Sequence, residues 1–217
     1  MAKSAAPTPY RQIRALHDEA RITVYQAYSE SIATAAVREQ KLDASSDFSL
    51  GRMTWIKPSW NWMMYRSGFS FKDKRQSRIL AIKMKPENFI KLLRKARVNE
   101  HHEPGTGGKE KAGLQGGEAK NDNAKNESTV VVQWDPERSN RIGKLEHRSI
   151  QIGISRHDCE EWVKERIAEI EDVTELARKH KEIVDAGMTN EEIEALGLLP
   201  VERPFNLPED VARILRM

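Results

Sequence analysis

Residues 52–68 (RMTWIKPSWNWMMYRSG) carry the residue types best suited to ligand chemistry. Three of the five tryptophans of the chain lie here, at Trp55, Trp60 and Trp62, interleaved with cations. Ring faces beside positive charges suit a nucleotide, because bases stack on rings and phosphates are attracted to cations. We therefore predict a binding site in this stretch, formed by Arg52, Trp55, Lys57, Ser59, Tyr65 and Arg66.

The same stretch has a structural interpretation. Trp55, Met63 and Met64 would then belong to the core, and Lys57 and Arg66 would extend outward from an ordinary amphipathic helix. An argument from cost favours a site, because burying an unpaired charge is unfavourable and an anionic ligand would supply the partner. The sequence leaves both interpretations open.

Two later segments supply further candidates. In residues 133–138 (QWDPER), the Asp135-Pro136 pair predicts a turn at the end of a strand. In residues 148–153 (RSIQIG), strand alternation places Arg148 on one face and Gln151 on the other. An arginine at the start of a strand either forms a salt bridge or binds an anion. We expect Arg148 and Gln151 to converge with the tryptophan-rich stretch on one concave surface.

The elements that must position these residues follow from periodicity and capping signals. Alternation predicts strands over residues 21–28, 78–84, 130–134 and 148–154, and extended chain over residues 48–55. Helices are predicted over residues 29–40, 58–66 and 86–97, with later ones beginning at Ser155 and near Thr189. This order predicts an α+β fold with a central, mostly antiparallel sheet, flanking helices and a helical C-terminal part.

Residues 165–174 (ERIAEIEDVT) fit either a continued helix or a strand. Ile167 and Ile170 keep helical spacing with Val163, whereas Asp172 and Thr174 have the pattern that precedes a new helix. We favour the strand, in which Glu169 and Glu171 point to the same face.

Charge and composition bound the remaining possibilities. The chain has 217 residues and a net charge of +3, and it lacks a long apolar run or an N-terminal signal, so we expect an intracellular protein, cytoplasmic or nuclear, without a membrane partner. Its only cysteine, Cys159, cannot form an internal disulfide, and no set of residues at metal-ligand spacing is present, so no metal site is predicted.

The charged residues are distributed unevenly along the chain. Residues 52–97 hold thirteen Lys and Arg against two acids, whereas residues 158–194 hold thirteen acids against five Lys and Arg. Such asymmetry is typical either of a basic ligand groove or of complementary solvated faces.

Domain boundaries follow from composition. Residues 99–128 contain six of the twelve glycines and little apolar material, which predicts a disordered insertion. Residues 1–20 are predicted to be a flexible N-terminal segment, and residues 21–217 to be one domain that this insertion interrupts.

With these motifs in view, the chain resembles the family called domain of unknown function 4291. The resemblance rests on VYQAYSESIATAAV (residues 24–37), RMTWIKPSWNWMMYRSG, RILAIKM, QWDPER, RSIQIG, EIEDVT and LLPVERPFNLP (residues 198–208). The WIKPS and QWDPER strings are highly specific. The insertion and the KRQSR segment before RILAIKM depart from the family pattern, and the family name implies no activity.

The order of elements is also similar to ADP-ribosyltransferase-type folds. That likeness implies an enzyme that binds NAD, with Tyr25 and Gln26 lining the pocket and the Glu169-x-Glu171 motif supplying the catalytic carboxylates. Gln26 replaces the early His or Arg of those folds, or else Arg52 or Arg148 supplies that group. The alternative hypothesis is a non-enzymatic module that binds nucleic acid through the basic residues 52–97.

Overall fold

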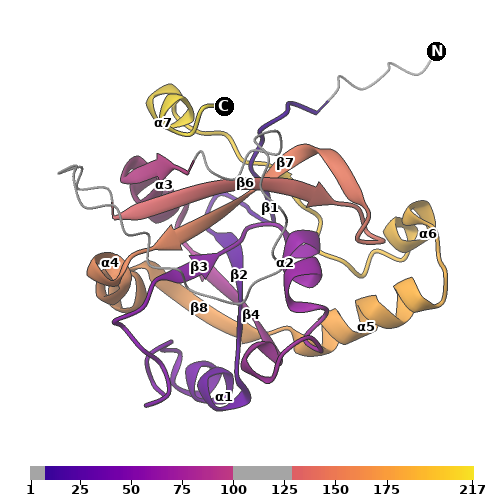
Figure 1. Cartoon of the computed structure of the whole chain (residues 1–217), viewed down its shortest axis with the longest axis horizontal. Coiled ribbons are helices and arrows are strands. Elements are labelled where there is room, and N and C mark those ends of the chain that lie inside the picture. Colours follow the sequence, from indigo (N-terminus) through magenta and orange to yellow (C-terminus); the bar gives the residue numbers. More distant parts are fainter. Residues whose placement is uncertain (1–7, 100–128) are drawn as a thin grey trace, which may run out of the picture.

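The computed structural model describes residues 8–99 and 129–217. The fold is α+β: two main sheets are flanked by helices, and the C-terminal part is largely helical (Figure 1). The predicted insertion at residues 99–128 lies, apart from Asn99, outside the described residues.

Two sheets form the frame of the molecule. The first is antiparallel, in the order β2 (Ile22–Tyr28), β4 (Arg78–Met84) and β8 (Ile167–Asp172). The second has the order β3-β7-β6-β5, in which only the β5–β6 pair is parallel, and its strands are Thr54–Ile56, Lys144–Ile154, Val130–Arg138 and Ala96–Val98. The sheet structure is therefore mostly antiparallel.

A backbone bridge joins the two sheets. Beyond the end of β3, Lys57 pairs with Tyr25 of β2, and each backbone amide donates a hydrogen bond to the other residue's carbonyl, at 2.7 and 3.1 Å. Because antiparallel partners place their side chains on the same face, Tyr25 and Lys57 project to one side of this junction.

Helices cover the sheets and the ends of the molecule (Figure 1). Seven α-helices occur in the described ranges: α1 (Glu30–Glu39), α2 (Trp60–Ser67), α3 (Pro86–Arg94), α4 (Arg156–Glu161), α5 (Thr174–Asp185), α6 (Asn190–Ala195) and α7 (Glu209–Ile214). A 3₁₀ turn, η1 (Lys74–Gln76), precedes β4, and a π-helical turn, η3 (Trp162–Arg166), connects α4 to β8.

Helix α2 is short and firmly bounded. Its N-cap is Ser59, whose hydroxyl accepts a hydrogen bond from the Trp62 amide, so the helix begins two residues after Pro58 rather than at it. Gly68 ends the helix in the left-handed conformation, with φ of +56°. The α2 helix packs against both β2 and β6 and thus lies across the junction of the two sheets.

Several local predictions needed correction. Asp135 and Pro136 do not form a turn but lie inside β6, which continues past a register shift to Arg138. The helix predicted over residues 86–97 ends at Arg94, and β5 follows it. The strand interpretation of residues 167–172 is confirmed, although the N-cap of the next helix is Val173 and not Thr174.

Part of the N-terminal segment is packed, in contrast to the expected flexibility of residues 1–20. Strand β1 (Arg14–Ala15) pairs with β9 (Arg203–Pro204), and the side chains of Ile13 and Ala15 are fully buried. Burial of two apolar residues offsets the cost of ordering this short segment.

Candidate functional site

Helix α2 divides the tryptophan-rich stretch between a core face and a polar face. Trp60, Met63 and Met64 pack with Tyr25 and Ala81 in a small buried cluster on the first sheet. The structural interpretation therefore holds for these residues. Trp62, Tyr65 and Arg66 lie on other sides of the helix and are considered below.

Lys57 lies three residues before α2 and is the most unusual group beside the polar face of that helix. Only 6% of this residue is exposed, and its Nζ lies 5.1 Å from the centre of the Trp62 ring. Burial, and next the positive charge of Arg66, lower the pKa of Lys57 from its usual 10.5 to about 7, and the charge of Asp135 opposes this shift. Within the described ranges, no carboxylate comes within ion-pair distance of its ammonium, and the charge of Asp135 offsets only part of the cost of burial.

Two arginines stand near Lys57 and Trp62. The guanidinium of Arg138 stacks on the Tyr65 ring at 3.6 Å, and Tyr65 in turn meets the Trp62 ring edge-on at 6.4 Å. Arg66 is partly buried and forms no ion pair within the described part of the chain. This surface therefore combines three cations with two aromatic rings, the combination that binds anionic, ring-bearing ligands.

A network of carboxylates lies at the N-terminus of α2. The Ser59 hydroxyl donates to Glu137 Oε1 at 2.8 Å, and the Trp60 amide donates to Glu202 Oε1 at 2.5 Å. Desolvation, and then the charge of Glu137, raise the pKa of Glu202 well above its usual 4.5. Burial and the charges of Glu202 and Glu171 likewise raise the pKa of the Tyr25 phenol. The Glu202 carboxyl and the Tyr25 phenol therefore both favour their protonated forms.

Sequence reasoning did not select Glu137, Arg138 or Glu202 as site residues. Glu137 and Arg138 belong to the QWDPER string and Glu202 to the LLPVERPFNLP string, both of which carried the family resemblance. No periodicity marks Glu202, because it reaches α2 from a segment 142 positions later in the chain. Their place in these two family motifs was the signal that could have identified the three residues.

Trp55 and Gln151 lie on the same outer face of the second sheet. Trp55 pairs with Gly153 across β3 and β7, and its ring lies directly on that glycine: a Cβ placed there would be 2.8 Å from the ring. On the next row of the face, Gln151 donates to Gln133 of β6. The pleat continues from Trp55 to Lys57, which brings the predicted Trp55, Lys57 and Gln151 onto one surface.

Three other predicted site residues lie apart from this surface. Arg148 is on the opposite face of β7 from Gln151, where its Nε donates to the Tyr10 hydroxyl at 2.9 Å. Gln26 alternates with Tyr25 along β2, and its amide donates to Thr54 Oγ1 and the Trp55 carbonyl. Arg52 is exposed before β3.

Glu169 and Glu171 lie on the same sheet face as Tyr25. Strand register places Tyr25, Ala81 and Glu171 in one row. Both carboxylates reach Lys83 Nζ, at 2.8 and 3.2 Å, and Glu169 also pairs with Arg21. Hydrogen bonding to Lys83 lowers the pKa of Glu169, so this carboxylate is ionised at neutral pH.

The basic stretch of residues 52–97 does not form one continuous positive face. Its cations are distributed over α2, η1, β4 and α3, and several are neutralised by carboxylates. Arg78 pairs with Glu30 and Asp172, Arg94 with Asp210, and Lys95 with Asp158 and Glu161.

His180 of α5 packs against Trp60 of α2. Its Nδ1 accepts from the Trp60 indole at 3.1 Å, so Nε2 carries the proton and donates to the Asn140 carbonyl at 2.6 Å. Burial lowers the pKa of His180 below its usual 6.5. The neutral ring therefore links α2, α5 and the β6–β7 turn.

We expect His180→Leu to destabilise the protein by about 2–3 kcal/mol at pH 8, because a buried indole N–H and a carbonyl lose their partners. The unfolded state takes up the histidine proton first as the pH falls below 6.5, so the wild type loses stability there and the difference from the variant narrows. Urea unfolding at pH 8 and pH 5 measures both effects. An equal difference at the two pH values would contradict the neutral, buried ring.

Neither a metal site nor a membrane-spanning helix emerges from the described ranges. No three His, Cys, Asp or Glu side chains gather there in a way that could hold a metal ion. None of the helices described is long and apolar enough to cross a membrane.

Comparison with known sequences identifies the family. A search of curated proteins finds no match. Residues 12–205 match the family described as domain of unknown function (DUF4291), which covers most of the chain from β1 to β9. The stretches that meet around α2 (WIKPSWNW, QWDPER and VERP) all fall inside the matched range. The chain therefore belongs to the domain of unknown function 4291 family.

Proposed function

We propose that this protein binds a nucleotide of the NAD type on the surface formed by Lys57, Trp62, Tyr65, Arg66 and Arg138, and acts on it as an enzyme. One observation carries the proposal: Lys57 is a buried cation beside an aromatic ring, and no described carboxylate neutralises it. A buried charge of this kind is costly for the fold. An anionic ligand would supply the missing partner.

The neighbouring groups favour a nucleotide over a simple anion. Lys57 and Arg66 can take phosphate oxygens, because both are cations without an ion-pair partner in the described part of the chain. The exposed Tyr65 ring, which stacks on Arg138, offers a ring face for a base, and the buried Trp62 packs against it. Trp55, on the same surface of the second sheet, extends this aromatic wall.

The catalytic part of the proposal concerns Glu171 and Glu169. In an ADP-ribosyltransferase-like reaction, a carboxylate polarises a ribose hydroxyl and stabilises the positive charge that develops when the glycosidic bond breaks. Glu171 shares its sheet row with Tyr25, beside which α2 packs, and Lys83 fixes both carboxylates. We assign Glu171 the catalytic role and Glu169 a positioning role through Lys83.

A thermal-shift panel of NAD, ATP and a single-stranded oligonucleotide tests the binding proposal. Nucleotide at a hundred times its dissociation constant should stabilise the wild type by about 2.7 kcal/mol. Arg66→Ala should abolish this shift and leave the melting temperature of the free protein nearly unchanged, because Arg66 is partly exposed and forms no ion pair in the described ranges. Lys74→Ala, an exposed cation of η1, is the matched control and should keep the full shift.

The panel also separates the rival hypothesis of a nucleic-acid module. Oligonucleotide binding should weaken steeply with salt, whereas binding of one nucleotide should depend on salt much less. Stabilisation by the oligonucleotide alone would favour the rival. If neither NAD nor ATP stabilises the protein at millimolar concentration, or if Arg66→Ala responds like the wild type, the proposed site is wrong.

A further inference from the structure

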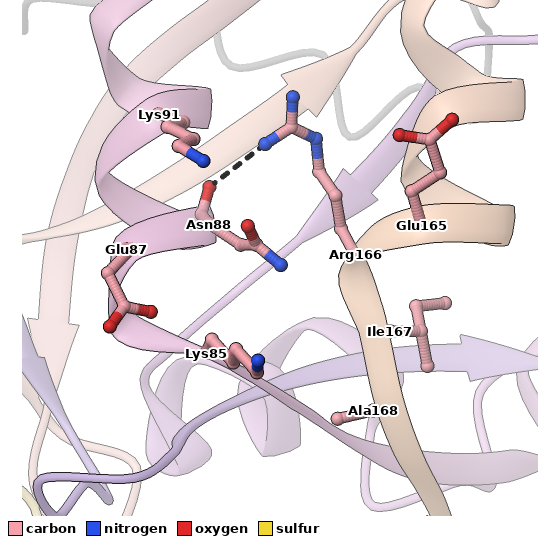
Figure 2. Close-up of a pocket in the computed structure, with 8 residues that line it drawn as sticks. All are labelled: Lys85, Glu87, Asn88, Lys91, Glu165, Arg166, Ile167 and Ala168. Atoms are coloured by element: carbon pink, nitrogen blue, oxygen red, sulfur yellow. Dashed lines mark hydrogen bonds between the residues drawn. The ribbon is translucent and has the colours of Figure 1, made fainter.

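A polar cavity lies between α3 and the start of β8, away from α2. Its volume is about 530 Å³, and Figure 2 shows the residues around it. The walls come from Lys85, Glu87, Asn88 and Lys91 on one side and from residues 165–168 on the other. It shares no residue with the α2 surface. A cavity of this size accommodates a small organic ligand.

Arg166 is the central group of this cavity. It is the last residue of the π-helical turn η3, and only 7% of its side chain is exposed. Its guanidinium lies between α3 and the segment that leads into β8, where Nη1 donates to the Asn88 carbonyl at 3.3 Å (Figure 2). Nη2 pairs with Glu161. These two contacts fix the orientation of the group, and its other N–H groups have no acceptor in the described part of the chain.

The surrounding charges favour an anion as the ligand. Lys85 and Lys91 also line the cavity, and neither forms an ion pair within the described ranges. Figure 2 shows Lys91 and Arg166 extending toward the same space, whereas Glu165 stands on the far side of the segment from Arg166. Glu87 is exposed at the rim and can turn toward solvent. Glu161 neutralises the charge of Arg166, so among the described residues the unpaired positive charge beside the cavity is that of the exposed Lys85 and Lys91.

We propose that this cavity binds a phosphate group, carried either by the free inorganic ion or by a small organic ester. Arg166 supplies the N–H groups that Asn88 and Glu161 leave unused, and the two unpaired lysines, Lys85 and Lys91, supply the charge from the α3 side. Ile167 and Ala168 provide a less polar wall for the rest of an ester. The π-helical turn supports this assignment, because such turns are frequent at functional sites.

Titration calorimetry with sodium phosphate and with glycerol 3-phosphate, at constant ionic strength, tests the proposal. We expect saturable binding of at least one probe to the wild type, and about tenfold weaker binding to the Lys85→Ala/Lys91→Ala double variant. Both lysines contact solvent, so the double variant should fold normally; its unfolding midpoint verifies this. The probe that binds more tightly identifies the inorganic ion or the ester as the source of the phosphate.

Matched variants show whether a loss of binding is specific to this cavity. Lys72→Ala/Lys74→Ala removes the same charge from an exposed loop and should bind like the wild type. Arg66→Ala, which removes a cation of the α2 surface, should also bind the probes normally, so failure here is distinguishable from failure of the proposed nucleotide site. The proposal is overturned if neither probe binds saturably, or if both double variants lose affinity equally.

Discussion

Lys57→Met is expected to stabilise the protein, by an amount on the order of 5 kcal/mol at pH 6. Methionine keeps the length and apolar stem of lysine and removes a charge that the fold buries. The magnitude follows from the pKa of Lys57, which is about 7 in the folded state against 10.5 in an exposed lysine. A stabilising substitution of this size is unusual and therefore diagnostic.

The gain should depend on pH in a defined direction. Between pH 7 and pH 10.5 the unfolded chain holds the lysine proton and the folded chain has released it, so wild-type stability rises with pH across this window. Below pH 7 both states are protonated and the full cost of the buried charge is present. The advantage of Lys57→Met should therefore be greatest below pH 7 and vanish near pH 10.5.

Urea unfolding of wild type and variant at pH 6, 7.5 and 9 measures this dependence. Lys74→Met, at an exposed position, is the control and should change little at any pH. If Lys57→Met destabilises the protein by the same amount at every pH, the ammonium has an anionic partner and the argument for a ligand at this point fails. The variant should also lose the stabilisation by nucleotide that we expect for the wild type.

Gly153→Ala should destabilise the protein by about 2–3 kcal/mol, because of overpacking. A Cβ at this position would lie 2.8–2.9 Å from three atoms of the Trp55 ring, closer than unbonded carbons approach. Gly153 is buried in β7, between β3 and β6, so the backbone cannot move aside. The Trp55 ring must leave its place on the sheet, and we expect nucleotide binding to weaken with it.

A double-mutant cycle with Trp55→Ala tests the cause. If the clash with the ring produces the loss, adding Gly153→Ala to Trp55→Ala should cost almost nothing further. Gly51→Ala is the control, since a Cβ there meets only Ser49 Oγ at 3.7 Å, an ordinary contact. Additive losses in the two variants would show that Gly153 is required for a reason other than the tryptophan.

The sequence by itself determined most of the secondary structure, because periodicity and capping are local. The strands at residues 22–28 and 78–84 alternate cleanly, and Ser59 and Gly68 bound α2. The helix predicted to begin near Thr189 is present, and a capping box of Thr189 and Glu192 starts it. Where local signals misled, tertiary pairing prevailed: β7 pairs with β6 through Asp135 and Pro136, so the expected turn does not form.

Part of the proposed site was also expected from the sequence. The cost of burying Lys57 and Arg66 among tryptophans favoured a ligand surface over an ordinary helix, and the structure brings Lys57, Arg66, Trp62 and Tyr65 close together around α2. Strand alternation separated Arg148 from Gln151, and the two do lie on opposite faces of β7. Alternation alone could not show whether both faces of β7 contribute to the predicted concave surface.

Only the tertiary structure decided which distant residues meet at α2. Glu137 reaches Ser59 across 78 positions, and Glu202 reaches Trp60 across 142. Two other contacts also depend on packing between segments far apart in the chain. One is the Tyr25–Lys57 pair between the sheets, and the other is the hydrogen bond from Arg166 of η3 to the Asn88 carbonyl of α3. Periodicity encodes which face of its own element a residue occupies, whereas the charge and burial around that residue come from other elements, which no local pattern specifies.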